Sequence, residues 1–472
     1  MLSICTTGHD RTGKRCSRRE LLRVGMLGFG SISLAHMLAA NLHAGSRHKF
    51  IRDKAVVMLN LQGGPTQFET FDPKMEAPQE IRSMFGEVRT SLPGICFGSH
   101  FPELAKRARQ LAIVRSYRHG MSSHEPAAWH VAAGGNATGA CMGSLYSHVA
   151  GITNNVTGIP NHTLVIPAAV STQYKSFNAV PSRVTQLGHL PAAYKAFDPS
   201  SGGQILDNMK LNITGSRLDD RRGLLTSLDD FKRRLDGSDA IGGADTFQRQ
   251  AFDVILGGVS EAFDISKEDR RLVAQYDTSM FDVHPESVAK RARKELIQGH
   301  SPVALGKQML LARRLVEAGC GFVTVACAGW DMHGDHEFEI ADGMPVLGPA
   351  VDKSVSAFLD DIEQRGLSEK ILLVITGEFG RTPKINKLLG RDHWGDLCPL
   401  VFAGGGLPMG QVIGQSDRHG GQPISDPISS ESVLATIFHT LFDIGELRLA
   451  SGLPTEIVRA ITAGQPISQL VS

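Results

Sequence analysis

The amino-acid sequence predicts an α/β fold, a sandwich built on a mostly parallel central sheet. Six short runs are nearly continuous in apolar residues instead of alternating, which is the pattern of parallel strands covered on both faces. These runs lie at residues 55–61, 111–117, 163–169, 322–328, 371–377 and 399–406. A helical stripe of apolar residues from Leu347 to Ile362 joins the fourth run to the fifth. We expect this unit of strand, helix and strand to be right-handed.

The first 44 residues are predicted to be a twin-arginine-type signal peptide. Basic residues precede a weakly apolar stretch from Val24 to Ala40, and "SRRELL" at residues 17–22 resembles the twin-arginine export motif. The alternatives are a basic helix start and a permanent anchor, but a membrane span needs about 20 strongly apolar residues. We expect cleavage after Ala44, export to the periplasm or the cell exterior, and no membrane span in the mature chain.

Residues 50–465 are expected to form one domain. The chain has 472 residues, of which 42% are hydrophobic and 21% charged, and this is ordinary for a soluble protein with a large core. Residues 170–300 differ, because charged amphipathic helices such as "RLDDRRGLLTSLDDFKRRLDG" follow one another there without strands between them. We predict that this region is a helical insertion or cap.

Charge and cysteine usage exclude several classes of function. The chain has 49 basic and 48 acidic residues, so no overall field points to nucleic acid or to an anionic membrane. Its seven cysteines form no C-x-x-C pair, which disfavours a zinc ribbon or a dense disulfide framework. The sequence leaves the oligomeric state open.

Side chains that can bind metals follow four of the predicted strands. Ligands in an open α/β sheet bind beyond the carboxyl ends of the strands, so we expect these side chains to converge at one edge. They are Thr66, Glu69 and Asp72; His119, Ser122, Ser123, His124 and His130; Asp331, His333, Asp335 and His336; and Glu378, Arg381, Asp392 and His393. Mixed imidazole and carboxylate ligands favour zinc, then manganese or iron; calcium is a further candidate but prefers more oxygen ligands.

Each group also has a purely structural explanation. Asp331 and His333 could belong to a solvated turn, Glu378 could pair with Arg381, and the histidines of residues 119–130 could bond to neighbours near a helix start. The common position of all four groups at the ligand-binding edge favours a metal site.

The order of these motifs resembles the alkaline phosphatase, sulfatase and phosphoglycerate mutase superfamily. The motif sequences resemble even more closely a secreted bacterial family of that superfamily, domain of unknown function 1501. The matching segments span nearly the whole chain and include "SRRELLRVG", "LQGGPTQFETFDPK", "VRSYRHGMSSHEP", "GWDMHGD", "GEFGRTPKIN", "GRDHW" and "GGGLPMGQVIGQSD". The resemblance implies an alkaline-phosphatase-like three-layer sandwich.

The resemblance also implies metal ligands. Asp331 and His333 stand where the first metal's Asp and His usually stand, with His336 as a substitute for His333. Glu378 falls at the second metal's Asp, and Phe379 takes the place of its neighbouring His. His393, with Asp392, looks like the final ligand. One metal site is therefore nearly complete, and the second has lost a ligand.

The nucleophile region departs from the superfamily pattern. When the sulfatase pattern C/S-x-P-x-R is placed on "HEPAAWHVAAGG", His124 takes the nucleophile position and Ala128 the arginine position, which contradicts a formylglycine sulfatase. Ser122 or Ser123 could serve as nucleophile at the start of the helix, with His124 as a ligand or a general base. Arg381 could clamp an anionic group.

The motifs and the resemblance together predict an exported metal-dependent hydrolase of phosphate or sulfate esters, acting on a small-molecule or glycan ester. The alternative is a metal-containing binding or structural protein of the cell envelope without turnover. That alternative draws on Phe379, on Ala128 and on "GGPT" after the first strand, where the superfamily has a metal-bridging Asp.

Overall fold

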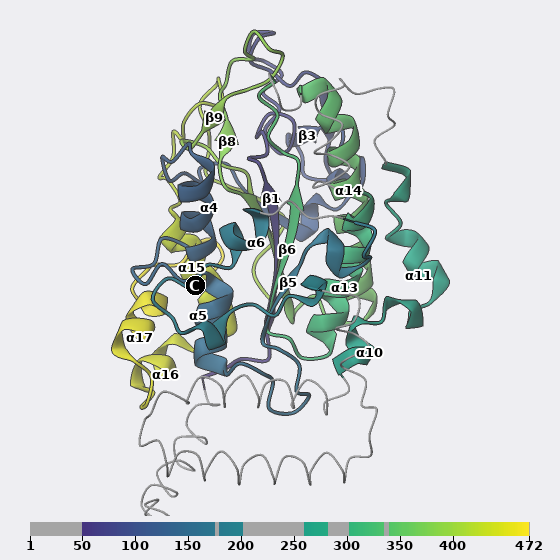
Figure 1. Ribbon diagram of the computed structural model, residues 1–472. Coiled ribbons are helices and arrows are strands. Elements are labelled where there is room, and N and C mark those ends of the chain that lie inside the picture. The colour runs from purple at the N-terminus through teal and green to yellow at the C-terminus, as the bar shows by residue number, and fades with distance from the viewer. Residues whose placement is uncertain (1–49, 175–178, 202–258, 282–301, 335–338, 472) are drawn as a thin grey trace, which may run out of the picture.

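The computed structural model describes residues 50–174, 179–201, 259–281, 302–334 and 339–471 (Figure 1). The predicted signal peptide lies outside the described residues, and so do Asp335, His336 and much of the predicted insertion at 170–300. No helix among the described residues is both long and apolar enough to cross a membrane.

A seven-stranded sheet forms the middle of the molecule, with the order β11-β4-β10-β7-β1-β6-β5. Its strands are β1 (Ala55–Gln62), β4 (Leu111–Val114), β5 (His162–Val165), β6 (Phe322–Ala328), β7 (Ile371–Gly377), β10 (Leu400–Gly404) and β11 (Gln411–Ile413). Strand β10 pairs antiparallel with β4 and with β7, whereas the other neighbouring strands pair in parallel. The predicted mostly parallel sheet is confirmed.

The direction of β10 corrects one expectation. The run at 399–406 was predicted as a parallel strand because it is apolar throughout, and β10 is indeed buried. A continuous apolar run shows burial on both faces but not strand direction. The segment between β7 and β10 contains only the short strands β8 (Gly380–Arg381) and β9 (His393–Trp394), without a crossover helix. The chain therefore re-enters the sheet from the edge where β7 ends, which makes β10 antiparallel.

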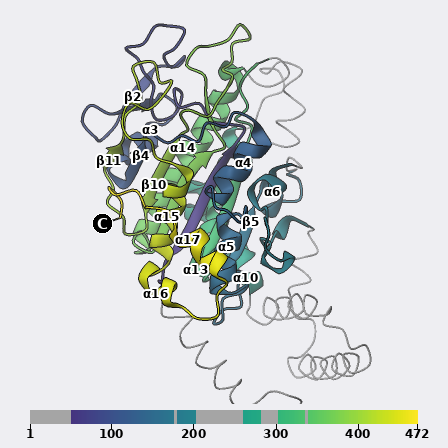
Figure 2. The same ribbon diagram turned by 90° about the vertical axis from the view of Figure 1, so that its left-hand side faces the viewer.

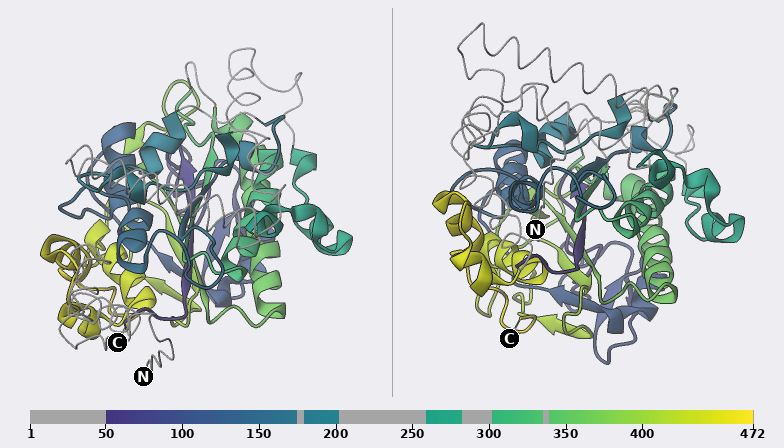
Figure 3. Two further views of the ribbon diagram at one scale, coloured as in Figure 1. Left: turned by 60° about the horizontal axis from the view of Figure 1, so that its bottom comes forward. Right: turned by 90° about the horizontal axis from the view of Figure 1, so that it is seen from below.

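Helices cover both faces of the sheet, which confirms the three-layer sandwich (Figures 1 and 3). Alternate residues of β1 belong to two different cores: Val57, Leu59 and Leu61 to one, and Val56 and Met58 to the other. The first core is closed by α3 (Pro102–Lys106), α13 (Leu305–Glu317) and α14 (Ile340–Gln364); the second by α4 (His124–Ala133), α5 (Met142–Ala150), α15 (Ser430–Leu441), α16 (Ile444–Leu449) and α17 (Thr455–Thr462). Figure 2 places α15 and α17 in front of the sheet.

The described parts of the predicted insertion contain short helices, namely α6 (Ala179–Val184), α10 (Val259–Phe263) and α11 (Arg270–Gln275). A buried ion network fastens the segment 259–281 to the sandwich. The fully buried Arg313 of α13 contacts Asp361 of α14 at 2.8 Å and Glu268 at 2.8 Å. The small hairpin of β2 (Glu87–Arg89) and β3 (Cys96–Gly98) completes the described strands.

A buried histidine at the sheet edge predicts how stability depends on pH. His162 is 2% exposed, and neither ring nitrogen has a hydrogen-bond partner among the described residues. Burial lowers the pKa of His162 to about 3. The folded protein therefore binds fewer protons here than the unfolded chain, whose histidine has a pKa of about 6.5. Stability falls as pH drops from about 6.5 toward 3, by up to about 1.4 kcal/mol per pH unit.

We expect the His162→Leu variant to lose less stability than the wild type between pH 6.5 and pH 4. Urea unfolding at several pH values measures this difference. The exposed His189, changed to Leu, is the control and leaves the wild-type slope unchanged. Equal slopes in wild type and His162→Leu would contradict the prediction.

Candidate metal centre

The site lies where three neighbouring parallel strands end. Strands β7, β1 and β6 are adjacent, so the residues that follow them meet at one edge of the sheet. Gly63 and Gly64, directly after β1, have φ angles of 114° and 86°. A Cβ atom at Gly63 would lie 2.4 Å from the backbone nitrogen of Asp331. Glycine is required because the β1 turn passes directly against the segment that carries Asp331.

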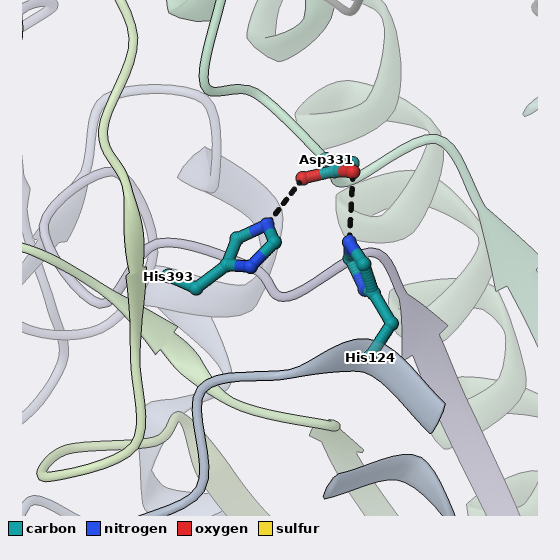
Figure 4. Close-up of side chains that lie close together, drawn as sticks. All are labelled: His124, Asp331 and His393. Atoms are coloured by element: carbon teal, nitrogen blue, oxygen red, sulfur yellow. Dashed lines mark hydrogen bonds and ion pairs between the residues drawn. The ribbon is translucent and has the colours of Figure 1, made fainter. Parts of the chain in front are cut away.

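Asp331 is the centre of a cluster of imidazoles (Figure 4). Its Oδ2 atom lies 2.9 Å from Nε2 of His124, the first residue of α4, and its Oδ1 atom lies 3.1 Å from Nε2 of His393. One ligand atom from each of the three residues lies within 4.8 Å of the others. All three side chains keep about a fifth to a quarter of their surface exposed, so the cluster is open to solvent.

Two further elements complete the cluster. Strands β8 and β9 pair Arg381 with His393, which carries the His393 ring to Asp331. The Nε2 atom of His333 lies 3.5 Å from Oδ2 of Asp331, and its ring lies 5.4 Å from that of His393. The structure therefore brings the predicted residues Asp331, His333 and His393 together, next to His124 at the start of α4.

Glu378 lies beneath His124 and is fully buried. Its Oε1 atom accepts a hydrogen bond from the Gly63 nitrogen at 2.8 Å and lies 2.9 Å from Nδ1 of His124. The Oε2 atom has no hydrogen-bond partner among the described residues. His119 donates from Nε2 to the Glu378 carbonyl at 2.7 Å and accepts at Nδ1 from the Met121 nitrogen. These contacts join the segment before α4 to the end of β7.

The charges of the cluster are strongly coupled. Burial by itself would lower the pKa of His124, but hydrogen bonds to Asp331 and Glu378 outweigh it and raise that pKa to about 9. Burial likewise opposes ionisation of Asp331, yet its hydrogen bonds to three histidines and the charge of Arg381 hold the pKa of this carboxyl well below its usual range. Without an ion, the protonated His124 bridges Asp331 and Glu378, and a metal bound at Nε2 would displace the proton there.

The donor set fits a transition metal. Ligand atoms about 2.1 Å from a tetrahedral ion lie about 3.4 Å apart. In the cluster, the two imidazole nitrogens lie 2.9 and 3.1 Å from different oxygens of Asp331, and one ligand atom from each residue lies within 4.8 Å of the others. His124, Asp331 and His393 would hold the ion, with His333 next to them. Three imidazoles and one carboxylate suit zinc better than calcium.

Arg381 does not lie where an anion clamp requires it. Its side chain is 1% exposed, and the guanidinium donates to the carbonyls of Gly63, Gly64, Trp330 and Arg391 and pairs with Oδ1 of Asp331 at 2.6 Å. The guanidinium is therefore directed at backbone carbonyls and Asp331, and burial shields it from a substrate at the exposed sheet edge. The structure thus places Arg381 in a buried ion pair with Asp331, whereas the sequence predicted an anion clamp.

The other predicted residues take different places. Asp392 is exposed and accepts a hydrogen bond from Asn386 at 2.9 Å, so the structure does not bring its carboxylate into the cluster. Ser122 accepts from the Gly395 nitrogen at 3.0 Å, and its carbonyl bonds Nδ1 of His393. Ser123 is exposed immediately before α4, and its side chain makes no capping bond.

Phe379, the position at which the resemblance implied the second metal's histidine, carries an apolar ring. It is fully buried and packs on the rings of His124 and His393, at centroid distances of 5.1 and 4.6 Å. The described residues thus offer one cluster of three or more metal-binding groups.

The amino-acid sequence matches one family model. A family model described as "Protein of unknown function (DUF1501)" matches residues 53–464. No curated protein matches the sequence.

Solved structures with some likeness include three enzymes. A sulfatase from Pseudoalteromonas sp. is 13% identical, with a TM-score of 0.34 over 86% of this chain and 74% of that chain. A lipoteichoic acid synthase from Listeria monocytogenes is 8% identical, with a TM-score of 0.29 over 89% and 81%. A phosphonate monoester hydrolase from Silicibacter pomeroyi is 10% identical, with a TM-score of 0.27 over 87% and 76%. The strand order and the layers of the chain itself define its three-layer fold.

Proposed function

The chain belongs to DUF1501, a family of proteins of unknown function, and we propose that it is an exported metal-dependent hydrolase of phosphate or sulfate esters. The observation that carries the proposal is the cluster of His124, Asp331 and His393, whose ligand atoms lie within 4.8 Å of one another at an exposed sheet edge. Export rests on the "SRRELL" motif of residues 17–22.

The residues around the cluster would have different roles in ester hydrolysis. A divalent ion at this site would polarise an ester oxygen and lower the pKa of a bound water. The exposed hydroxyl of Ser123 stands directly before α4, and Ser122 lies one residue earlier, so both are candidate nucleophiles. The N–H groups of the first turn of α4 favour an anionic group there. Asp331 and Glu378 orient His124, and Arg381 offsets the charge of Asp331 from below.

The alternative is a metal-containing cell-envelope protein without turnover. Two observations favour it: Phe379 has an apolar ring at a position that the resemblance assigns to a metal ligand, and the Arg381 guanidinium is buried against backbone carbonyls. A metal bound only to hold the loops at this edge together would need neither a second ion nor an anion clamp.

Two measurements on the exported protein decide between these functions. The protein is expressed with its own N-terminus, recovered from the periplasm, and assayed for bound metal by elemental analysis. It is then tested on aryl phosphate, aryl sulfate and phosphodiester substrates with added zinc, manganese or calcium. We expect metal-dependent hydrolysis by the wild type and a rate more than 100-fold lower in His393→Ala. Loss of a residue that only hydrogen-bonds to a metal ligand typically reduces activity by about 10- to 100-fold.

His439→Ala is the control, since this histidine lies on α15 outside the cluster. It is expected to keep wild-type metal content and activity. Absence of metal in the wild-type protein would refute the hydrolase. Stoichiometric metal without hydrolysis of any of the substrates would favour the cell-envelope alternative.

A further inference from the structure

The loop between β8 and β9 contains an asparagine that uses its whole hydrogen-bonding capacity. The Oδ1 atom of Asn386 accepts from the backbone nitrogens of Leu388 and Gly390, at 2.9 and 3.0 Å. Its Nδ2 atom donates to the carbonyl of His333 and to Oδ1 of Asp392, both at 2.9 Å. An amide side chain has two donor hydrogens and two acceptor lone pairs, so all four positions are filled. In the reverse amide orientation, the Nδ2 hydrogens would face the backbone N–H groups of Leu388 and Gly390.

The same loop encloses the backbone of His333. A Cβ atom at Gly390 would lie 2.2 Å from the carbonyl carbon of His333, and one at Gly334 would lie 2.3 Å from the carbonyl oxygen of Leu388. The Arg391 nitrogen donates to the Met332 carbonyl at 3.0 Å. The segment 332–334 therefore packs directly against the loop, and its position depends on the loop's shape.

Backbone strain shows that the loop's shape needs support. Leu389 has a φ of 59°, and Lys74 is the other non-glycine residue with positive φ in the part of the chain that the structure describes. A branched residue rarely adopts this conformation unless its surroundings impose it. The bonds from Leu388 and Gly390 to Asn386 stand on both sides of Leu389 and hold its conformation.

We propose that Asn386 is the positioning residue that sets His333 against Asp331 and makes it the fourth group of the metal centre. The proposal deepens the function given above and rests on it. Asn386 touches no ligand atom; it acts through the His333 backbone. Asp392, bonded to the same amide, is part of this support and not a ligand.

Asn386→Asp is the sharpest test because it preserves shape and removes both donors. The new carboxylate would face the His333 carbonyl and the Asp392 carboxylate, and both contacts become repulsive. We expect zinc affinity, measured by competition with a chelator, to weaken by about 10- to 100-fold, the range for outer-shell partners. In a His333→Ala background the same change is expected to have no further effect. An undiminished effect there would overturn the proposal.

Asn154 provides a matched control. Its Oδ1 atom also accepts from two turn nitrogens, of Val156 and Thr157, and its Nδ2 atom donates to a distant carbonyl, that of Gly319, at 3.0 Å. Asn154→Asp disturbs a similar turn away from the site. It is expected to leave zinc affinity unchanged even where it lowers the melting temperature. An equal loss of zinc affinity in both variants would show a general structural effect and overturn the proposal.

A readout without metal separates this proposal from the proposed function. The rate at which diethyl pyrocarbonate modifies His333, followed by mass spectrometry with His439 as internal reference, reports how the ring is held. We expect a faster rate in Asn386→Asp than in wild type or Asn154→Asp. An unchanged rate would overturn the positioning role. If the wild-type protein binds no zinc while Asn386→Asp is still modified faster than the wild type, only the metal function is refuted.

Discussion

Asp331→Asn is expected to abolish high-affinity metal binding. The variant keeps the size of the side chain but removes the charge that His124, His333 and His393 share. Metals of this class are bound by carboxylates and neutral imidazoles, and a neutral amide is a poor replacement. We expect zinc affinity to fall by more than the about 10- to 100-fold of an outer-shell change. Elemental analysis and chelator competition measure the loss.

Asp396→Asn is the control for this variant. Asp396 also pairs with an arginine, Arg118, at 2.7 Å, but both side chains are more than a third exposed. Its loss is expected to leave metal content unchanged, since a surface pair contributes little. Unchanged zinc affinity in Asp331→Asn would show that the histidines and Asp331 form only a hydrogen-bonded cluster.

The meeting of Asp331 and Glu378 at one sheet edge could be predicted from the sequence, because strand order converts apolar runs into positions in space. Asp331 and Glu378 each follow a buried run, and parallel neighbours bring such residues to one edge. His124 was expected as ligand or general base, and the structure places it between two carboxylates. The length of the apolar runs and their endings were enough for this part of the site.

The roles of Arg381 and Asp392 could not be predicted in the same way. Both are charged residues in the segment between β7 and β10, and sequence alone does not tell a buried charged residue from an exposed one. Arg381 is buried because the glycines after β1 bring their carbonyl oxygens against its guanidinium. Asp392 lies away from the cluster, where its carboxylate accepts a hydrogen bond from the Asn386 amide. Asn386 itself has no sequence signal, because its function depends on contacts 53 residues away along the chain.

The second prediction with a large effect concerns Arg381. In Arg381→Met the carbonyls of Gly64, Trp330 and Arg391 lose their donor, and Asp331 loses its cation. Breaking a buried pair by removing one partner reduces stability by about 3–5 kcal/mol. We expect a decrease of this size in the free energy of unfolding, measured with urea, together with loss of metal. An anion clamp would instead raise KM for the ester and leave stability unchanged.

Arg118→Met separates the two explanations. Arg118 pairs with an aspartate at 2.7 Å, as Arg381 does, but 42% of its side chain is exposed. Exposed pairs contribute about 1 kcal/mol or less, so this variant is expected to unfold close to the wild-type urea concentration. If Arg381→Met were as stable as Arg118→Met, the Arg381 guanidinium would not support Asp331. The role of an anion clamp would then be favoured again. The two ion pairs have similar lengths, 2.6 Å for Arg381 and 2.7 Å for Arg118, so the contrast between a buried and an exposed arginine shows what burial against the carbonyls of Gly63 and Gly64 contributes.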